Sequence, residues 1–186
     1  MVFFSKGINP AKKISFIITK SLINTISLED LLLKEDKTIL TLSKKRELLK
    51  NLALIARKLH INGINHRDFY LCHFHVKRDL DFSLESVFLI DLHRAQIRKQ
   101  VPIRWATKDI GGLYHSAMDI GLSERDCYRF LKIYFDMPLK DFFNQKKKFI
   151  ESSRRRAFSM YMQPILKEID INPRIDIEPT SSYLRG

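Results

Sequence analysis

Two aspartates near the middle of the chain stand in settings that suit phosphoryl transfer. Asp68 follows His66 and Arg67 in a short polar segment, and Asp91 ends an apolar run that begins at Val87. Phosphoryl transfer requires one carboxylate that orients the attacking hydroxyl and another that holds a divalent cation on the phosphates. We therefore predict that Asp68 is the catalytic base and that Asp91 binds Mg²⁺. We expect the His66 ring to pack and hydrogen-bond within the loop, and Arg67 to pair with a carboxylate or the activation segment.

The residues around these aspartates differ from those of an ordinary protein kinase. Protein kinases place an asparagine metal ligand about five residues after the loop aspartate, whereas this chain has His73 at that position. Asp91 is followed by Leu92 and His93 rather than by Phe and Gly. His73 is therefore a candidate metal ligand, with packing in the core as the alternative.

Two features of this region leave alternatives open. Five of the six histidines lie between His60 and His93, together with Cys72, so a zinc site competes with the kinase interpretation. Asp109 could be a buried aspartate that holds the backbone of the catalytic loop, as in kinase-like folds. It could equally be an ordinary acid in the first turn of a helix.

The composition indicates a globular protein. A chain of 186 residues, with 45% hydrophobic and 29% charged side chains, is long enough for one domain with a sizeable core. No apolar run reaches the roughly 18 residues that a membrane-spanning helix needs, and the N-terminus lacks a signal-peptide pattern. The two cysteines, Cys72 and Cys127, are too few for a disulfide framework and suggest a reducing cytoplasm.

The first half of the chain predicts short strands around two helices. A capping box from Ser27 to Asp30 predicts a short helix to about residue 33. Residues 44–61 carry apolar side chains at helical spacing, and Gly63 ends that pattern. Strands are expected at 2–4, 14–19, 69–76 and 87–92, with the last two paired around a charged turn.

The second half predicts helices. Pro102 interrupts the chain before a helix that begins at residue 107 or 108 and stops near 121. Gly111 and Gly112 weaken that helix. A second capping box, which begins at Ser123, predicts a helix to about residue 135.

The longest expected helix, residues 141–162, is strongly basic. The chain carries a net charge of +12, which implies an anionic partner such as nucleic acid, a phospholipid surface or a phosphorylated substrate. Lys146–Lys148 and Arg154–Arg156 favour anionic membrane headgroups, and a solvated helix face is the alternative. Nucleic acid is disfavoured, because the aromatic residues do not interleave with the basic runs. The expected buried face comprises Phe143, Ile150, Ala157 and Tyr161.

Three segments carry a resemblance to a known family: Gly63–Phe74, Ile90–Arg98, and Arg104–Trp105 with Lys108–Ile110 and Gly112–Tyr114. With shorter matches at 9–11, 15–19 and 26–30, they resemble the lipopolysaccharide core heptose(I) kinase family (WaaP/RfaP) from about residue 4 to about residue 135. The resemblance implies an α+β, protein-kinase-like fold, formed mainly by the helical C-terminal lobe. It also implies ATP and Mg²⁺ as cofactors, and phosphorylation of heptose I in the lipopolysaccharide inner core. His73 matches the residue that this family has there.

The resemblance further implies a peripheral position at the cytoplasmic face of the inner membrane. Family members carry a further N-terminal stretch, which holds the strands over the phosphates and a lysine that pairs with ATP. No glycine-rich phosphate loop precedes Asp68 here, so no ATP-binding residue is assigned. We expect a remnant of the N-terminal sheet and hinge at 1–26, a kinase-like lobe at 27–163, and an irregular tail at 164–186.

This organisation suggests a C-terminal portion whose activity on its own is open. The first alternative function is that of a related sugar kinase such as a Kdo kinase, against which residues 90–98 argue. The second is a catalytically inactive fragment that binds lipopolysaccharide or anionic membrane.

Overall fold

The computed structural model describes residues 3–6, 15–18, 21–34 and 40–168. Strands β1 (Phe3–Lys6) and β2 (Ser15–Ile18) pair in antiparallel register, with Phe3 opposite Ile18. Both strands were predicted, with bounds that differ by a residue or two. The turn expected between them, and the tail beyond residue 168, lie outside the described residues.

A three-stranded antiparallel sheet carries the middle of the chain. Its order is β3 (Thr25–Ser27), β5 (Phe74–Lys77) and β6 (Val87–Leu89). The predicted pairing of the last two strands is confirmed. The prediction of a strand from residue 69 is wrong, because residues 71–73 form a short 3₁₀ turn, η2 (Leu71–His73), in which the Leu71 N–H bonds the Ser116 hydroxyl instead of a neighbouring strand.

The first helices begin at hydroxyl caps. In α1 (Leu28–Leu33), the Ser27 hydroxyl accepts the Asp30 N–H at 3.1 Å, so the predicted cap is confirmed. Helix α2 (Leu42–Ile61) begins after Thr41, two residues earlier than expected. Its buried side chains face the core, because they recur at helical spacing.

Helix α3 (Ile103–Ser116) begins directly after Pro102, whereas we predicted a start at residue 107 or 108. Proline suits this position, because its fixed φ and missing N–H cost nothing where backbone donors lack partners. Helix α4 (Glu124–Phe135) shows the predicted capping box, in which Ser123 and Asp126 bond each other's backbone N–H.

Helix α5 (Leu139–Glu168) continues through Pro164, so the expectation that the chain becomes irregular there is wrong for the next four residues. Its buried face contains Phe149, Ser153 and Ala157. Phe143, predicted to be buried, is 43% exposed and lies edge-on against Tyr128.

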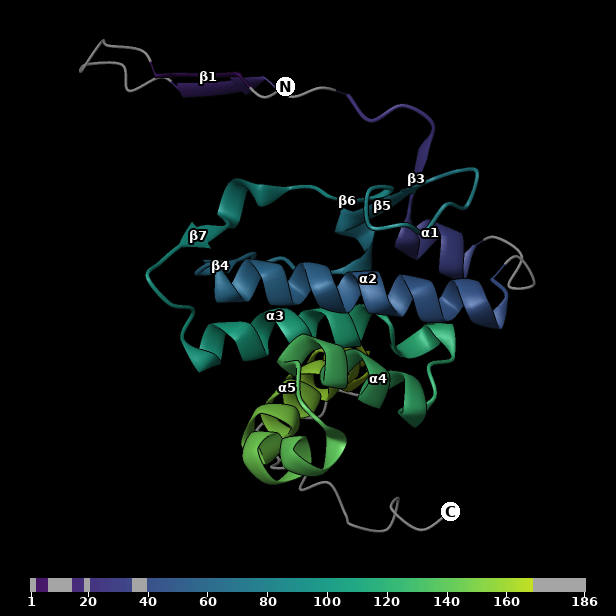
Figure 1. Ribbon diagram of the computed structural model, residues 1–186, viewed down its shortest axis with the longest axis vertical. Coiled ribbons are helices and arrows are strands. Elements are labelled where there is room, and N and C mark those ends of the chain that lie inside the picture. Colours follow the sequence, from purple (N-terminus) through teal and green to yellow (C-terminus); the bar gives the residue numbers. More distant parts are fainter. Residues whose placement is uncertain (1–2, 7–14, 19–20, 35–39, 169–186) are drawn as a thin grey trace.

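In Figure 1 the β3-β5-β6 sheet lies on one side of α2, and helices α3, α4 and α5 lie on the other. Helix α4 contacts α2, and α5 contacts α3. One core runs through these layers and includes Leu28, Leu52, Phe69, Phe74 and Leu113. The fold is therefore α+β and mainly helical, as predicted.

Candidate active site

The loop that carries Asp68 is held in place by a buried aspartate on α3. Asp109 is 1% exposed, and its two carboxylate oxygens accept the backbone N–H groups of His66 at 2.7 Å and of Arg67 at 2.9 Å. Arg67 adopts a left-handed φ of 76°, a conformation that costs energy for a residue with a Cβ. Asp109 thus holds the catalytic-loop backbone, and the alternative of an ordinary first-turn acid is wrong.

A second contact ties Asp109 to helices α2 and α4. The His60 Nε2–H donates to Asp109 at 3.2 Å, and His60 Nδ1 accepts the Tyr134 hydroxyl at 2.6 Å. Burial raises the pKa of Tyr134, so its hydroxyl stays protonated and remains a donor. Three helices therefore converge on one carboxylate that positions the loop.

His66 connects this loop to the segment before Asp91. Its Nε2–H donates to the Ile90 carbonyl at 3.0 Å, and its ring stacks on His73 with a centroid separation of 5.8 Å. Burial lowers the pKa of His66, which favours the neutral ring. The prediction that His66 packs and hydrogen-bonds is confirmed.

Asp68 is partly exposed and is held from two sides. Arg94 donates to its Oδ1 at 2.8 Å, and the His73 Nδ1–H donates to its backbone carbonyl at 2.6 Å. For Arg67 we expected a carboxylate or the activation segment as partner; its guanidinium lies over the Trp105 ring. The arginine that pairs with Asp68 is therefore Arg94, from the segment after Asp91.

Asp91 faces His73 across the site. It has left-handed backbone angles, φ 62° and ψ 50°, and its Oδ2 lies 3.3 Å from His73 Nε2. A hydrogen bond from His93 Nδ1 lowers the pKa of Asp91, so the carboxylate is ionised at neutral pH. Asp68, His73 and Asp91 are thus connected through a short series of contacts.

The arrangement of His73 and Asp91 fits a shared cation. His73 Nδ1 donates to the Asp68 carbonyl, and Nε2 faces the Asp91 oxygen. A cation bound between this nitrogen and the carboxylate would contact both side chains. Within the described part of the chain, no group of three or more His, Cys, Asp or Glu side chains could hold a metal. Asp91 supplies the carboxylate oxygen that Mg²⁺ prefers, and Mg²⁺ keeps water and substrate phosphate oxygens in the rest of its shell.

A short strand pair joins the two aspartate segments. Strand β4 (Ile64–Asn65) pairs with β7 (Gln96–Ile97), and the Arg98 N–H donates to the Gly63 carbonyl at 2.8 Å. A Cβ on Gly63, whose φ is +76°, would lie 1.8 Å from the Arg98 carbonyl oxygen. Only glycine fits this position.

Gly111 and Gly112 allow close packing on both sides of α3. A Cβ on Gly111 would lie 3.0 Å from the Ser153 carbonyl oxygen of α5, and a Cβ on Gly112 would lie 3.2 Å from the Phe69 carbonyl oxygen of the catalytic loop. The sequence signalled this pair only as a weakness in the helix. In the fold, both glycines let neighbouring segments approach the helix that carries Asp109.

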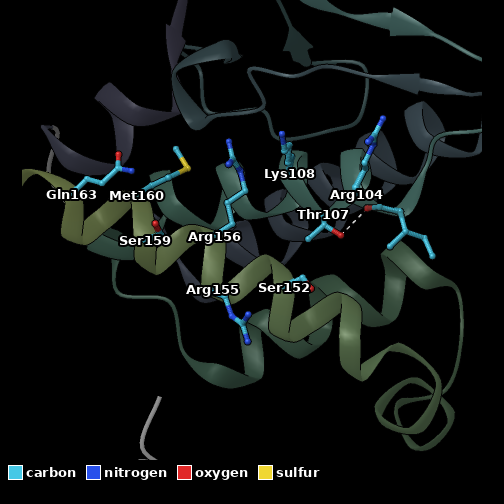
Figure 2. A pocket seen from close by; sticks show the side chains of 10 residues that line it. Arg104, Thr107, Lys108, Ser152, Arg155, Arg156, Ser159, Met160 and Gln163 are labelled. Carbon is cyan, nitrogen blue, oxygen red and sulfur yellow. Dashed lines mark hydrogen bonds between the residues drawn. The ribbon is translucent and has the colours of Figure 1, made fainter. Parts of the chain in front are cut away.

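Trp105 is surrounded by cations. The cationic groups of Arg67, Arg98, Arg104 and Lys108 lie 5.7, 5.5, 5.3 and 4.5 Å from its ring centroid. A groove of about 600 Å³ between α3 and α5 adjoins this cluster (Figure 2). It is lined by Ile103, Arg104, Thr107, Lys108, Ser152, Arg155, Arg156, Ser159, Met160 and Gln163.

Sequence reasoning missed the roles of His60, Tyr134 and Arg94. His60 stands at an inward position of a predicted helix, which could have marked it as a buried polar residue. Arg94 lay in a segment that carries the family resemblance but had no assigned role, and Tyr134 carried no signal. The contacts of both depend on how α4 and the segment after Asp91 fold back on the loop. None of the helices described is long and apolar enough to cross a membrane.

The chain is similar to known proteins over most of its length. A family model, the lipopolysaccharide kinase (Kdo/WaaP) family, matches residues 1–134. The chain is 42% identical over 171 residues to lipopolysaccharide core heptose(I) kinase WaaP of Escherichia coli, covering 91% of this chain and 64% of that protein. It is 37% identical to the WaaP heptose(I) kinase of Pseudomonas aeruginosa, covering 87% of this chain and 61% of that protein. It thus spans about three fifths of the length of these relatives.

A solved structure, WaaP in complex with acyl carrier protein, resembles this fold with a TM-score of 0.72 and 37% identity. The match covers 86% of this chain and 67% of that one. The likeness confirms the predicted kinase-like α+β fold, and together with the sequence match it settles the family. The chain belongs to the lipopolysaccharide kinase (Kdo/WaaP) family.

Proposed function

We propose that this chain carries the catalytic centre of a kinase that transfers phosphate from ATP to heptose I of the lipopolysaccharide inner core. The observation that carries the proposal is the pair of aspartates, Asp68 and Asp91, which are linked through His73. Asp109 accepts the backbone N–H groups of His66 and Arg67, so Asp68 sits on a fixed backbone rather than on a free loop.

In this proposal Asp68 orients the attacking sugar hydroxyl and accepts its proton. Arg94 bonds Oδ1 of Asp68 and fixes the direction of the carboxylate, so that Oδ2 serves the hydroxyl. A positioned base of this kind contributes about 10²- to 10⁴-fold to rate. No ATP-binding lysine is assigned.

Asp91 and His73 would hold Mg²⁺, which when bound neutralises charge on the nucleotide phosphates. A hydrogen bond from His93 keeps Asp91 anionic at neutral pH, as a cation ligand must be. His73 also bonds the Asp68 backbone, so the ring couples the position of the cation site to that of the base.

The relatives favour heptose over Kdo as the acceptor. Family membership alone covers both sugars, whereas the curated relatives at 37–44% identity are named heptose(I) kinases. The basic face of α5 and the net charge of +12 favour an anionic membrane as the surface on which the substrate is met. We therefore place the chain at the cytoplasmic face of the inner membrane, attached peripherally.

The test is transfer of labelled phosphate from ATP by the 186-residue chain to two acceptors. One acceptor is lipopolysaccharide that ends in a heptose without a phosphate on that sugar, and the other ends in Kdo. We expect transfer to the first only, and its loss in Asp68→Asn but not in Asp141→Asn. Asp141 is exposed and forms no hydrogen bond or ion pair within the described part of the chain. Transfer to Kdo alone would replace the proposed acceptor.

A catalytically inactive binder remains the competing function. It predicts no transfer to either acceptor, and unchanged binding of lipopolysaccharide when Asp68 becomes asparagine. Binding without transfer, in a chain that melts cooperatively, would therefore overturn the proposed kinase activity of this chain.

A further inference from the structure

We infer that the four cations around Trp105, together with the groove between α3 and α5, bind an oxyanionic group of the saccharide acceptor. This site, here called the Trp105 cluster, consists of Arg67, Arg98, Arg104, Lys108 and the ring itself. The inference rests on the proposed function for the identity of the acceptor. It assigns a substrate contact to residues that the catalytic pair does not use.

The first argument is uncompensated charge. None of the four cations forms an ion pair with a carboxylate of the described residues, and the Arg98 guanidinium bonds the neutral side-chain oxygens of Asn65 and Gln96. Four like charges gathered around one ring repel one another. One aromatic ring offers each of them a modest cation–π attraction. An anion between them removes the repulsion, which the ring cannot do.

The second argument is the chemistry of the groove. Arg104 and Lys108, one turn apart on α3, line it from one side, and Arg155 and Arg156 line it from α5. Figure 2 shows Arg104, Lys108 and Arg156 directed to the same side. No acidic residue lines the groove, and its volume of about 600 Å³ suits a saccharide-sized ligand.

The third argument is a pair of buried donors. Trp105 Nε1 and Arg156 Nε are both enclosed and have no hydrogen-bond partner among the described residues. Buried N–H groups without an acceptor are costly. Trp105 belongs to the cluster and Arg156 to the lining of the groove, so an oxyanion that bound there and reached these N–H groups would supply their missing acceptors.

The fourth argument is position. Arg67 immediately precedes the proposed base, and Asp109 fixes the Arg67 backbone from one turn beyond Trp105 on the same helix. An acceptor whose acidic group lay in the Trp105 cluster would therefore be anchored beside Asp68. The group is a phosphate or a carboxylate, since guanidinium and ammonium groups bind both.

The experiment uses Trp105 as the probe, because it is the sole tryptophan of the chain. Its emission is followed while deacylated, heptose-containing lipopolysaccharide is added without ATP, so that binding is read independently of transfer. We expect a saturable change in emission that weakens as salt rises. The absence of any change in a folded chain would overturn the proposal, whether or not the chain transfers phosphate.

The decisive variant is Arg104→Gln/Lys108→Gln, which removes two exposed charges and leaves the catalytic loop intact. We expect its affinity for the acceptor to fall about tenfold or more, since charged hydrogen bonds are the stronger kind. Arg46→Gln/Lys50→Gln is the matched control, because these two residues form an exposed pair at the same spacing on α2. Equal affinity in both double variants would contradict the proposal.

Two further acceptors identify the source of the oxyanion. If the dephosphorylated acceptor loses the response, the group is a phosphate; if the carboxyl-reduced acceptor loses it, the group is a carboxylate. If both modified acceptors still give the full change in emission, the proposal is overturned. A response to anionic phosphatidylglycerol vesicles alone would also overturn it and would assign the cluster to the membrane surface.

Discussion

The two proposed catalytic aspartates are positioned by different means. Two buried side chains fix the Asp68 loop. Asp109, 1% exposed, accepts the backbone N–H groups of the loop, and His60, 9% exposed, bonds Asp109. Asp91 itself has a left-handed backbone conformation, and the side chains that follow it, among them His93 and Arg94, are exposed. The comparison teaches that the base depends on the core of the helical lobe, whereas the cation site depends on surface contacts that can adjust.

The largest effect is expected where the two regions are joined. Gly63→Ala should destabilise the fold by several kcal/mol: about 1–2 kcal/mol from the left-handed φ, and the rest from the contact with the Arg98 carbonyl. Urea unfolding measures the change. Gly121→Ala is the control, since Gly121 has a φ of +69° but nothing within 4 Å of a Cβ. Equal losses in the two variants would show that β4 and β7 do not hold the regions together.

A somewhat smaller effect is expected from the buried side of the comparison. Asp109→Ala leaves the backbone N–H groups of His66 and Arg67 without acceptors, so the free energy of unfolding should fall by about 3 kcal/mol. Phosphate transfer should fall with it. Asp136→Asn, at an exposed left-handed position that asparagine tolerates, should change little. If the Asp109 variant is stable but inactive, Asp109 takes part in the reaction and does not serve mainly to hold the loop.

The pH dependence of stability tests the buried histidine between the two regions. Burial lowers the pKa of His66, and burial also lowers that of His75. The folded state therefore binds fewer protons than the unfolded state. The stability that the two neutral histidines contribute is complete above about pH 6.5 and is lost as the pH falls below that value. Urea midpoints between pH 7.5 and 5 should decline for the wild type and decline less for His66→Gln. The double variant with His75→Gln should show the smallest slope, and an unchanged slope would refute the account.

The smallest effect on stability is expected on the exposed side. Arg94→Gln removes a partly exposed ion pair with Asp68, so the free energy of unfolding should change by less than about 1 kcal/mol. Transfer should nevertheless fall by about tenfold, because the Asp68 carboxylate loses the contact that orients it. Thermal unfolding and transfer rate, measured on the same sample, separate the two. Normal transfer in this variant would show that Arg94 does not orient the Asp68 carboxylate.

The sequence predicted local features well and long-range ones poorly. Ser27 and Ser123 marked two helix starts correctly, because a hydroxyl cap and its acid are neighbours in the chain. Pro102 and Pro164 were misjudged, since proline can begin a helix and can also be carried within a long packed one. The choice between two roles for Asp109 could not be made, because burial comes from α2 and α4, which lie elsewhere in the sequence.

The candidate site followed the same rule. Asp68, His73 and Asp91 were found from short motifs, and their roles remain proposals that the contacts support. Arg104 and Lys108 stood in a segment that carries the family resemblance but had no assigned role, because their relation to Arg67 and Arg98 arises only in the fold. These four cationic residues are separated in the sequence and lie around one tryptophan ring in the fold.

The central claim is that Asp68 acts on the acceptor hydroxyl and Asp91 on the cation. The most direct test is the initial rate of phosphate transfer to heptose-ended lipopolysaccharide, measured against Mg²⁺ concentration in the wild type, Asp68→Asn and Asp91→Asn. We predict that Asp68→Asn lowers the rate by about 10²-fold or more at every Mg²⁺ concentration, and that Asp91→Asn raises the Mg²⁺ concentration required for half-maximal rate. A wild-type rate in Asp68→Asn, or an unchanged Mg²⁺ requirement in Asp91→Asn, would contradict the account.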